Sequence, residues 1–347
     1  MNKVVDNYIL LDKLGAGQFA EVFKGKDRLN DMHVAVKVYS LQKFLSTPKL
    51  KEMILNEIKA LQDLNSTNII HFYKMLKTTN NIYLVYEYCD SHTLEDYIIS
   101  KKFLSEKEAL QLMKQLSNAF KEILMKNIIH RDIKPSNILL TSTGVLKVGD
   151  FGLCKFLDPA QEQLEKLETI INHAIEKTVI VGSPIYMAPE LLKGQPINKK
   201  VDLYSLGIVF YEMLFGVCPF EDSNVENLIY KIEKGSLNFP LERNGISLKT
   251  QNFIREMLRP DPYLRIEWDK FFGFFEETMV FPGKVEYLMT NEENNRNNNN
   301  NKNNFLGERA VSFLDELPKM KEIGLFPPNS GIFLFIYDNN FLNHRKK

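Results

Sequence analysis

The sequence predicts an α+β protein with two lobes, a small strand-rich N-terminal lobe and a larger, mostly helical C-terminal lobe. Apolar and β-branched residues alternate over residues 8–39, which is typical of strands. After residue 89 the pattern turns mostly helical, with apolar residues at helical spacing in four segments between residues 105 and 259. The chain has 347 residues, of which 44% are hydrophobic and 25% are charged, enough for a large core. We expect a functional site in the cleft between the lobes.

The N-terminal lobe is predicted to span about residues 8–89. The segments "YILLDKLG" and "AEVFKGKD" flank a glycine turn, and "HVAVKVYS" continues the alternating pattern. Residues 49–64 carry apolar side chains at helical spacing, which predicts one long helix. The segment "IYLVYEYC" at 82–89 predicts a further strand that ends this lobe.

The C-terminal lobe is predicted to span about residues 90–275. Its helical segments are 105–126, 200–216, 224–234 and 247–259. Residues 276–347 form a tail of different composition, in which ten of the fourteen residues from 291 to 304 are asparagine. Such a segment cannot bury a core, so we expect a linker there.

Composition excludes some classes of protein. The formal net charge is zero, which argues against a protein that coats nucleic acid or an anionic membrane. Three cysteines without a CxxC pair indicate reduced thiols in a cytoplasmic protein. The first residues include charges that a signal peptide would lack, and the apolar run at 332–337 is too short to span a membrane.

The stretch "LGAGQFAEV", residues 14–22, has a GxGxxxxV pattern, and glycines allow a backbone to approach phosphates closely. A dinucleotide-binding loop needs a following helix, but Val22 and Phe23 continue into a strand, so that alternative is disfavoured. Lys37 in "VAVK" and Glu57 in the next helix could form an ion pair that directs the ammonium group toward phosphates.

The stretch "IIHRDIKPSNILL", residues 128–140, contains a D-x-K-x-x-N pattern made by Asp132, Lys134 and Asn137. A carboxylate can orient a hydroxyl nucleophile, and an ammonium group can neutralise charge on a moving phosphoryl group. The Asn137 amide oxygen and the carboxylate of Asp150 in "DFG" are hard ligands that suit magnesium. This pattern predicts phosphoryl transfer.

The order of glycine loop, VAVK, HRD, DFG and APE (188–190) resembles the eukaryotic protein kinase family over about residues 8–275. The resemblance implies the bilobal protein kinase fold, ATP and Mg²⁺ as cofactors, and protein substrates. Lys134 and Ser183, in "GSPIYMAPE", are typical of the serine/threonine class. The catalytic and "GSPIYMAPE" stretches are similar to those of autophagy-initiating kinases.

The resemblance also assigns roles to residues at matching positions. Asp132 would orient the substrate hydroxyl, Lys134 would contact the γ-phosphate, and Lys37 would pair with Glu57 and the α- and β-phosphates. Asn137 and Asp150 would hold magnesium. The residues expected around ATP are Leu14, Gly15, Ala16, Gly17, Gln18, Phe19, Ala20, Glu21, Val22, Ala35, Lys37, Glu87, Cys89 and Leu139.

Four further positions match the family. Tyr86 occupies the gatekeeper position before the hinge, where a large phenol should narrow the pocket behind adenine. Glu190 and Arg265 match a buried ion pair of the large lobe. Asp202 matches the residue that steadies the catalytic loop.

The activation segment, Asp150 to Glu190, is long at 41 residues. Arg131 and Lys155 predict that a phosphate on Thr178, added by another kinase or by autophosphorylation, orders this segment. Thr169 is a second candidate, and pairing of Arg131 with a carboxylate such as that of Glu176 is the alternative. Residues 158–177 read as an amphipathic helix, either a solvated insertion or an autoinhibitory element.

Two other functions remain as alternatives to an active protein kinase. A pseudokinase scaffold would have lost Lys37, Asp132 or Asp150, and all three are present. A small-molecule kinase would lack a peptide-binding segment like the one that ends in APE. A phosphate-transfer assay on a protein substrate would separate the three functions.

Overall fold

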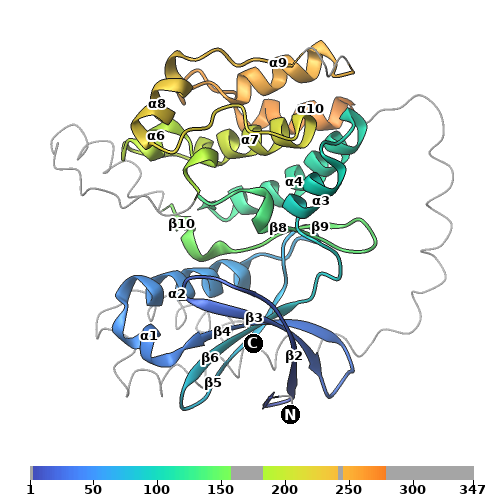
Figure 1. Cartoon of the computed structure of the whole chain (residues 1–347), viewed down its shortest axis with the longest axis vertical. Coiled ribbons are helices and arrows are strands. Elements are labelled where there is room, and N and C mark those ends of the chain that lie inside the picture. The colour runs from blue at the N-terminus through green and yellow to red at the C-terminus, as the bar shows by residue number, and fades with distance from the viewer. Residues whose placement is uncertain (1–2, 158–182, 241–244, 279–347) are drawn as a thin grey trace, which may run out of the picture.

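The computed structural model describes residues 3–157, 183–240 and 245–278. The chain forms two lobes stacked along its long axis, a sheet with two helices below and a helical lobe above (Figure 1). The predicted α+β architecture with two lobes is therefore confirmed. The predicted helix at 158–177, Thr169, Thr178 and the tail from residue 279 lie outside the described residues.

The N-terminal lobe is built on an antiparallel sheet with the strand order β1-β2-β3-β4-β6-β5. Its strands are β1 (Val4–Val5), β2 (Tyr8–Ala16), β3 (Ala20–Asp27), β4 (His33–Ser40), β5 (Phe72–Lys77) and β6 (Asn81–Glu87). β6 lies between β4 and β5 and is buried from Ile82 to Tyr86, so it is the rigid centre of this lobe.

Two helices cover this sheet, the short α1 (Leu41–Ser46) and the long α2 (Pro48–Asp63). α2 begins with Pro48, whose missing amide hydrogen costs nothing at the first helical position. Its apolar face is buried as the sequence predicts. Glu57 is also buried, with 3% of its surface exposed. Because a carboxylate is rarely buried without a partner, Glu57 indicates a candidate functional site in this lobe.

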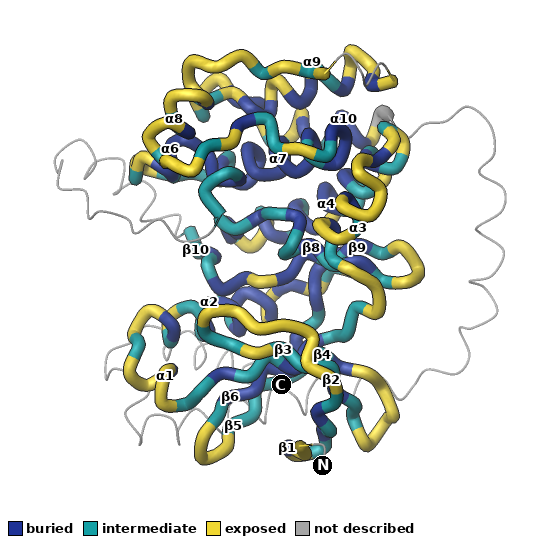
Figure 2. The backbone as a smooth tube through the Cα atoms, viewed as in Figure 1, coloured by how far each residue is buried: buried dark blue, intermediate teal, exposed yellow. Residues whose placement is uncertain are grey.

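The other helices of the described residues lie in the C-terminal lobe. They are α3 (Leu94–Lys101), α4 (Glu106–Met125), α6 (Pro189–Leu192), α7 (Lys200–Phe215), α8 (Val225–Lys234), α9 (Leu248–Met257) and α10 (Trp268–Thr278). α7 is apolar around most of its circumference and lies buried in the middle of the lobe (Figure 2). It ends at Gly216, whose φ of 73° and close approach to the Lys102 carbonyl oxygen exclude a side chain.

Helix caps explain where several of these helices begin. Thr93 and Asp96 form a reciprocal capping box at the start of α3, and Ser105 and Glu108 do the same for α4. Each pair satisfies backbone amide hydrogens that the first helical turn leaves unpaired.

Short strands and turns between the lobes carry the catalytic motifs. They are β7 (Ile128–Ile129), β8 (Ile138–Leu140), β9 (Leu146–Val148), β10 (Lys155–Phe156) and the 3₁₀ turns Pro135–Asn137, Phe151–Leu153 and Pro184–Tyr186. β7 pairs with β10, and β8 pairs with β9. These pairings bring the stretches around residues 130 and 150 together.

One apolar cluster runs through both lobes. It includes Ile58 of α2, Leu84 of β6, Phe151 after β9 and Phe210 of α7. A second, smaller cluster covers the other face of the sheet around Tyr83. The catalytic motifs therefore lie on a core that the two lobes share.

Candidate active site

The catalytic loop, residues 130–137, is held in place by Asp202 of α7. The buried Asp202 carboxylate accepts hydrogen bonds from the backbone amides of His130 at 2.8 Å and Arg131 at 2.9 Å. Arg131 has a φ of 64°, a left-handed conformation that a residue with a side chain adopts only at a cost. The two bonds from Asp202 stabilise this conformation and so fix the direction of the loop.

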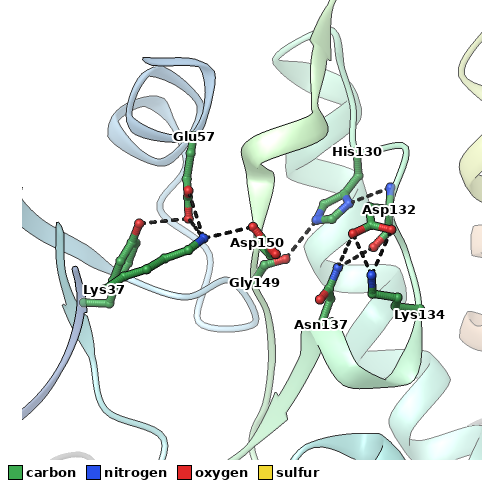
Figure 3. A network of polar contacts seen from close by, with 9 residues as sticks. Lys37, Glu57, His130, Asp132, Lys134, Asn137, Gly149 and Asp150 are labelled. Carbon is green, nitrogen blue, oxygen red and sulfur yellow. Dashed lines mark hydrogen bonds and ion pairs between the residues drawn. The ribbon is translucent and has the colours of Figure 1, made fainter. Parts of the chain in front are cut away.

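Asp132, Lys134 and Asn137 meet around one carboxylate (Figure 3). Lys134 Nζ lies 3.2 and 3.0 Å from the two carboxylate oxygens of Asp132. Asn137 Nδ2 donates at 2.8 Å both to the Asp132 carbonyl oxygen and to its Oδ2. Because the Asn137 amide nitrogen is used in this way, its side-chain oxygen remains an acceptor for a cation.

His130 joins the catalytic loop to the DFG stretch. Its Nε2 lies 3.0 Å from the Gly149 carbonyl oxygen, and its ring stands edge-on to the buried Phe151 at 4.6 Å (Figure 3). Asp150 lies between Gly149 and Phe151 in the chain and has a left-handed backbone conformation with a φ of 56°. The sequence predictions gave His130 no role of its own, although its place at the head of HRD was the available signal.

Lys37 of β4 lies between two carboxylates. Its Nζ is 3.2 Å from each oxygen of Glu57 and 3.1 Å from Asp150 Oδ1 (Figure 3). Burial lowers the pKa of Lys37, but the charges of Glu57 and Asp150 outweigh this effect and raise that pKa well above its ordinary value. The Lys37 ammonium group in turn lowers the pKa of Asp150. Both groups therefore stay charged at neutral pH.

Tyr86 makes a contact that the sequence did not predict. Its hydroxyl donates a 2.8 Å hydrogen bond to Glu57 Oε1. The sequence analysis predicted only that Tyr86 narrows the pocket behind adenine, because a partner 29 residues away cannot be inferred from the residue type.

The predicted nucleotide residues come from the N-terminal sheet, its β2–β3 turn, the segment after β6 and, in the case of Leu139, from β8. Leu14, Gly15 and Ala16 lie in β2, Gly17, Gln18 and Phe19 in the turn, Ala20, Glu21 and Val22 in β3, Ala35 and Lys37 in β4, Glu87 and Cys89 at and beyond the end of β6, and Leu139 in β8. The Gly17 amide donates to the Ala20 carbonyl oxygen at 2.8 Å and closes the turn. A side-chain carbon at Gly15 would meet no atom of the described residues within 4 Å, so none of them blocks the approach of a ligand to this backbone.

The hinge between the lobes is braced by its own side chains. The Glu87 carboxylate pairs with Lys147 of β9 at 2.7 Å and accepts a bond from the His71 amide at 3.2 Å. Asp90 accepts hydrogen bonds from the amide and hydroxyl of Ser142 at 2.7 and 2.5 Å. These contacts join the hinge to the β8–β9 hairpin on the C-terminal side of the cleft.

The Arg131 guanidinium group binds backbone carbonyls. Its Nε donates to the Leu153 carbonyl oxygen at 2.6 Å and its Nη2 to the Cys154 carbonyl oxygen at 3.4 Å. Burial lowers the pKa of Arg131. The side chain thus reaches the start of the activation segment, while Glu176, its predicted alternative partner, lies outside the described residues.

Within the described ranges, no three side chains among His, Cys, Asp and Glu gather closely enough to hold a metal ion by themselves. None of the described helices combines the length and apolar character needed to cross a membrane.

Comparison with known proteins adds to this geometry. Residues 8–273 match the model of the protein kinase domain family. Over 278 residues the chain is 36% identical to serine/threonine-protein kinase atg1 of Dictyostelium discoideum, covering 78% of this chain and 39% of that protein. It is 35% identical to ATG1a of Arabidopsis thaliana over 78% of this chain and 42% of that protein. It is 33% identical to ULK3 of Mus musculus over 78% of this chain and 54% of that protein.

These relatives are longer than the matched region, since the chain covers between 39% and 54% of their lengths. Their names confirm the predicted resemblance to the serine/threonine class and to the atg1 group within it. The family match covers the same residues that carry the glycine loop, the catalytic loop and the DFG stretch. The chain therefore belongs to the protein kinase family.

Proposed function

We propose that this protein is a serine/threonine protein kinase that transfers the γ-phosphate of ATP to serine or threonine hydroxyls of protein substrates. One observation carries the proposal: the Asp132 carboxylate, bound by Lys134 and Asn137, lies beside the ion pairs that join Lys37 to Glu57 and Asp150 (Figure 3). A pseudokinase scaffold would have no need for this complete set of groups.

In the proposed reaction the substrate hydroxyl oxygen forms a bond to the γ-phosphorus while the bond to the β–γ bridging oxygen breaks. Asp132 orients the hydroxyl and accepts its proton. Lys134, 3.0 Å from Asp132 Oδ2, balances the charge of the transferring group. Lys37 holds the α- and β-phosphates, and its pair with Glu57 keeps its ammonium group in place.

Asn137 and Asp150 would hold magnesium, and their oxygens fit that ion. The Asp150 side chain is 46% exposed, so it is open to a cation from the cleft. A site with only two protein ligands suits magnesium, which keeps waters and phosphate oxygens in its shell. When bound, the ion would neutralise charge on the phosphates.

The ATP itself would lie against the β2–β3 turn. The absence of described atoms around a side-chain carbon placed at Gly15 supports close approach of the phosphates to the backbone. Val22, Ala35 and Leu139 would enclose adenine, and the Glu87 carbonyl and Cys89 amide at the hinge would bind its polar edge. All these roles follow from the family pattern and the positions of the residues in the structure.

We extend the proposal to the whole chain as a kinase domain at 8–275, with lobes at about 8–89 and 90–275, and a tail at 276–347. Its three cysteines are free thiols, which supports a place in the cytoplasm, and signalling through protein substrates is the proposed role. No binding of nucleic acid is proposed, since the formal net charge is zero.

We also propose that phosphate on Thr178, added by another kinase or by autophosphorylation, raises activity. The support is that the Arg131 guanidinium already lies against the first residues of the activation segment. Full activity in a Thr178→Ala variant, with its unmodified mass verified, would rule this out.

The function is tested by radiolabel transfer from ATP to a generic basic protein in the presence of magnesium. We expect the Asp132→Asn variant to transfer phosphate about 10² to 10⁴ times more slowly than the parent chain. Label on serine and threonine, identified after acid hydrolysis, would support the proposed class. Equal transfer by the parent chain and the variant would overturn the proposal.

A further inference from the structure

We propose that Tyr86 is a positioning residue for phosphoryl transfer, because its hydroxyl anchors Glu57, and with it α2, to the central strand of the N-terminal lobe. The inference rests on the proposed kinase function. It concerns how the Lys37–Glu57 pair is maintained, a task that neither the catalytic loop nor the glycine turn performs.

The Tyr86 hydroxyl and the Glu57 carboxylate form a short, buried hydrogen bond. Tyr86 Oη and Glu57 Oε1 are 2.8 Å apart, a closer contact than the 3.2 Å between Lys37 Nζ and the same carboxylate. Tyr86 is 7% exposed and Glu57 is 3% exposed, so little water competes for this carboxylate. A hydrogen bond to a buried charge is among the strong ones in a protein.

Tyr86 is held in place by the strands on both sides of β6. β6 is paired on both edges, and Tyr86 lies opposite Ala35 of β4 and Phe72 of β5. The Tyr86 and Phe72 rings also pack together with centroids 5.6 Å apart. The phenol therefore projects from the most constrained strand of the lobe, whereas Glu57 projects from a helix at its surface.

The Tyr86 hydroxyl is the donor of its hydrogen bond to Glu57. Burial and the nearby Glu57 carboxylate raise the pKa of Tyr86 well above its ordinary value. The phenol consequently stays protonated at neutral pH and donates, and Glu57 accepts. Lys37 and Tyr86 thus hold one carboxylate from two elements, which fixes the rotation of α2 about its axis.

Loss of the hydroxyl should let α2 shift. In Tyr86→Phe the ring still packs on Phe72, but Glu57 keeps only its bond to Lys37. We expect kcat to fall about tenfold, because a small displacement of Lys37 misplaces the phosphates, while the KM for the protein substrate stays unchanged. Amide hydrogen exchange in the second half of α2 should become faster, by about tenfold.

Tyr83→Phe is the matched control. Tyr83 is a fully buried tyrosine on the same strand, but it belongs to the apolar cluster on the other face of the sheet. Its hydroxyl accepts a bond from the Asn81 side chain at 3.3 Å and does not contact the site. This control should retain both kcat and the exchange rate of α2.

A second readout separates positioning from general loosening. If Tyr86 acts through Glu57, then adding Tyr86→Phe to a Glu57→Gln variant should change kcat less than twofold. The proposal is overturned if Tyr86→Phe leaves kcat and the hydrogen exchange of α2 unchanged, or if Tyr83→Phe lowers kcat equally. It is also overturned if the effects of Tyr86→Phe and Glu57→Gln on kcat are additive. If the parent chain transfers no phosphate, the kinase proposal fails, and exchange in α2 still decides whether Tyr86 anchors the helix.

Discussion

The Glu190 carboxylate and the Arg265 guanidinium form a buried bidentate ion pair, with Nη1–Oε1 and Nη2–Oε2 distances of 2.7 and 2.9 Å. Both residues are at most 3% exposed. Arg265 also donates to the carbonyl oxygens of Arg259, Lys200 and Pro260. The pair ties the end of the APE stretch to the turn between α9 and α10, as the sequence predicted.

Removing one partner of this pair should destabilise the fold strongly. In Arg265→Met the Glu190 carboxylate keeps its burial but loses its counter-charge, so we expect the free energy of unfolding to fall by about 3–5 kcal/mol. Urea unfolding followed by circular dichroism measures this change. The control is Arg255→Met, an exposed arginine on α9 that should cost less than about 1 kcal/mol. Equal losses in the two variants would contradict the argument.

Asp202 should act on catalysis without touching a substrate. Asp202→Ala leaves the His130 and Arg131 amides without their acceptor and the left-handed Arg131 without support. We expect kcat to fall at least about tenfold and the free energy of unfolding to fall by about 1–3 kcal/mol for each orphaned amide. Asp202→Asn keeps one acceptor oxygen and should lose less of its kcat and less of its free energy of unfolding. A normal kcat of Asp202→Ala in steady-state assays would exclude this positioning role.

Asn137 should set the magnesium requirement. Asn137→Ala removes one proposed oxygen ligand and also the two bonds of its amide to Asp132. The magnesium concentration for half-maximal activity should rise about tenfold or more. Titration of phosphate transfer against magnesium at saturating ATP checks this, with the exposed Asn252→Ala as the control. An unchanged magnesium titration would show that Asn137 is no ligand.

The three thiols should make the fold less stable at alkaline pH. Burial raises the pKa of Cys89, Cys154 and Cys218 to about 12, from an ordinary value of 9.0. The folded state thus keeps its thiol protons where the unfolded chain loses them. Their stabilising effect is complete below pH 9 and is lost as the pH rises toward 12, by up to about 1.4 kcal/mol per pH unit for each thiol.

The measurement for this prediction is the urea midpoint between pH 8 and 10.5. Cys154→Ser removes one titrating thiol and keeps a donor near the Asn56 carbonyl oxygen, 3.8 Å from Sγ. The decline in stability with pH should become shallower in that variant, by up to about 1.4 kcal/mol per pH unit. Identical slopes for the two proteins would contradict the assignment.

Short motifs made the catalytic centre predictable from sequence. Asp132, Lys134 and Asn137 lie within six residues, so a single tight loop brings them together whatever the rest of the chain does. Lys37 and Glu57 were predicted as a pair, and the structure places them 3.2 Å apart. Long helices such as α4 and α7 were also predicted, because their apolar spacing extends over several turns.

Other features depend on tertiary context. β1 and α1 are too short for periodicity, β5 is only partly buried, and α10 carries five aromatic residues around Gly273 that hide any amphipathic pattern. The Tyr86–Glu57 bond joins residues from a strand and a helix, and its existence depends on how α2 packs. No local pattern encodes either the packing or the bond.

The apolar cluster shared by the two lobes has a consequence for how this chain could be divided. Ile58 and Leu84 from one lobe pack in the same cluster as Phe151 and Phe210 from the other. A chain cut at the hinge would expose this apolar seam on both fragments, so neither fragment would be a self-sufficient module. The lobes are better regarded as halves of one folding unit, which could be transplanted or inherited only together.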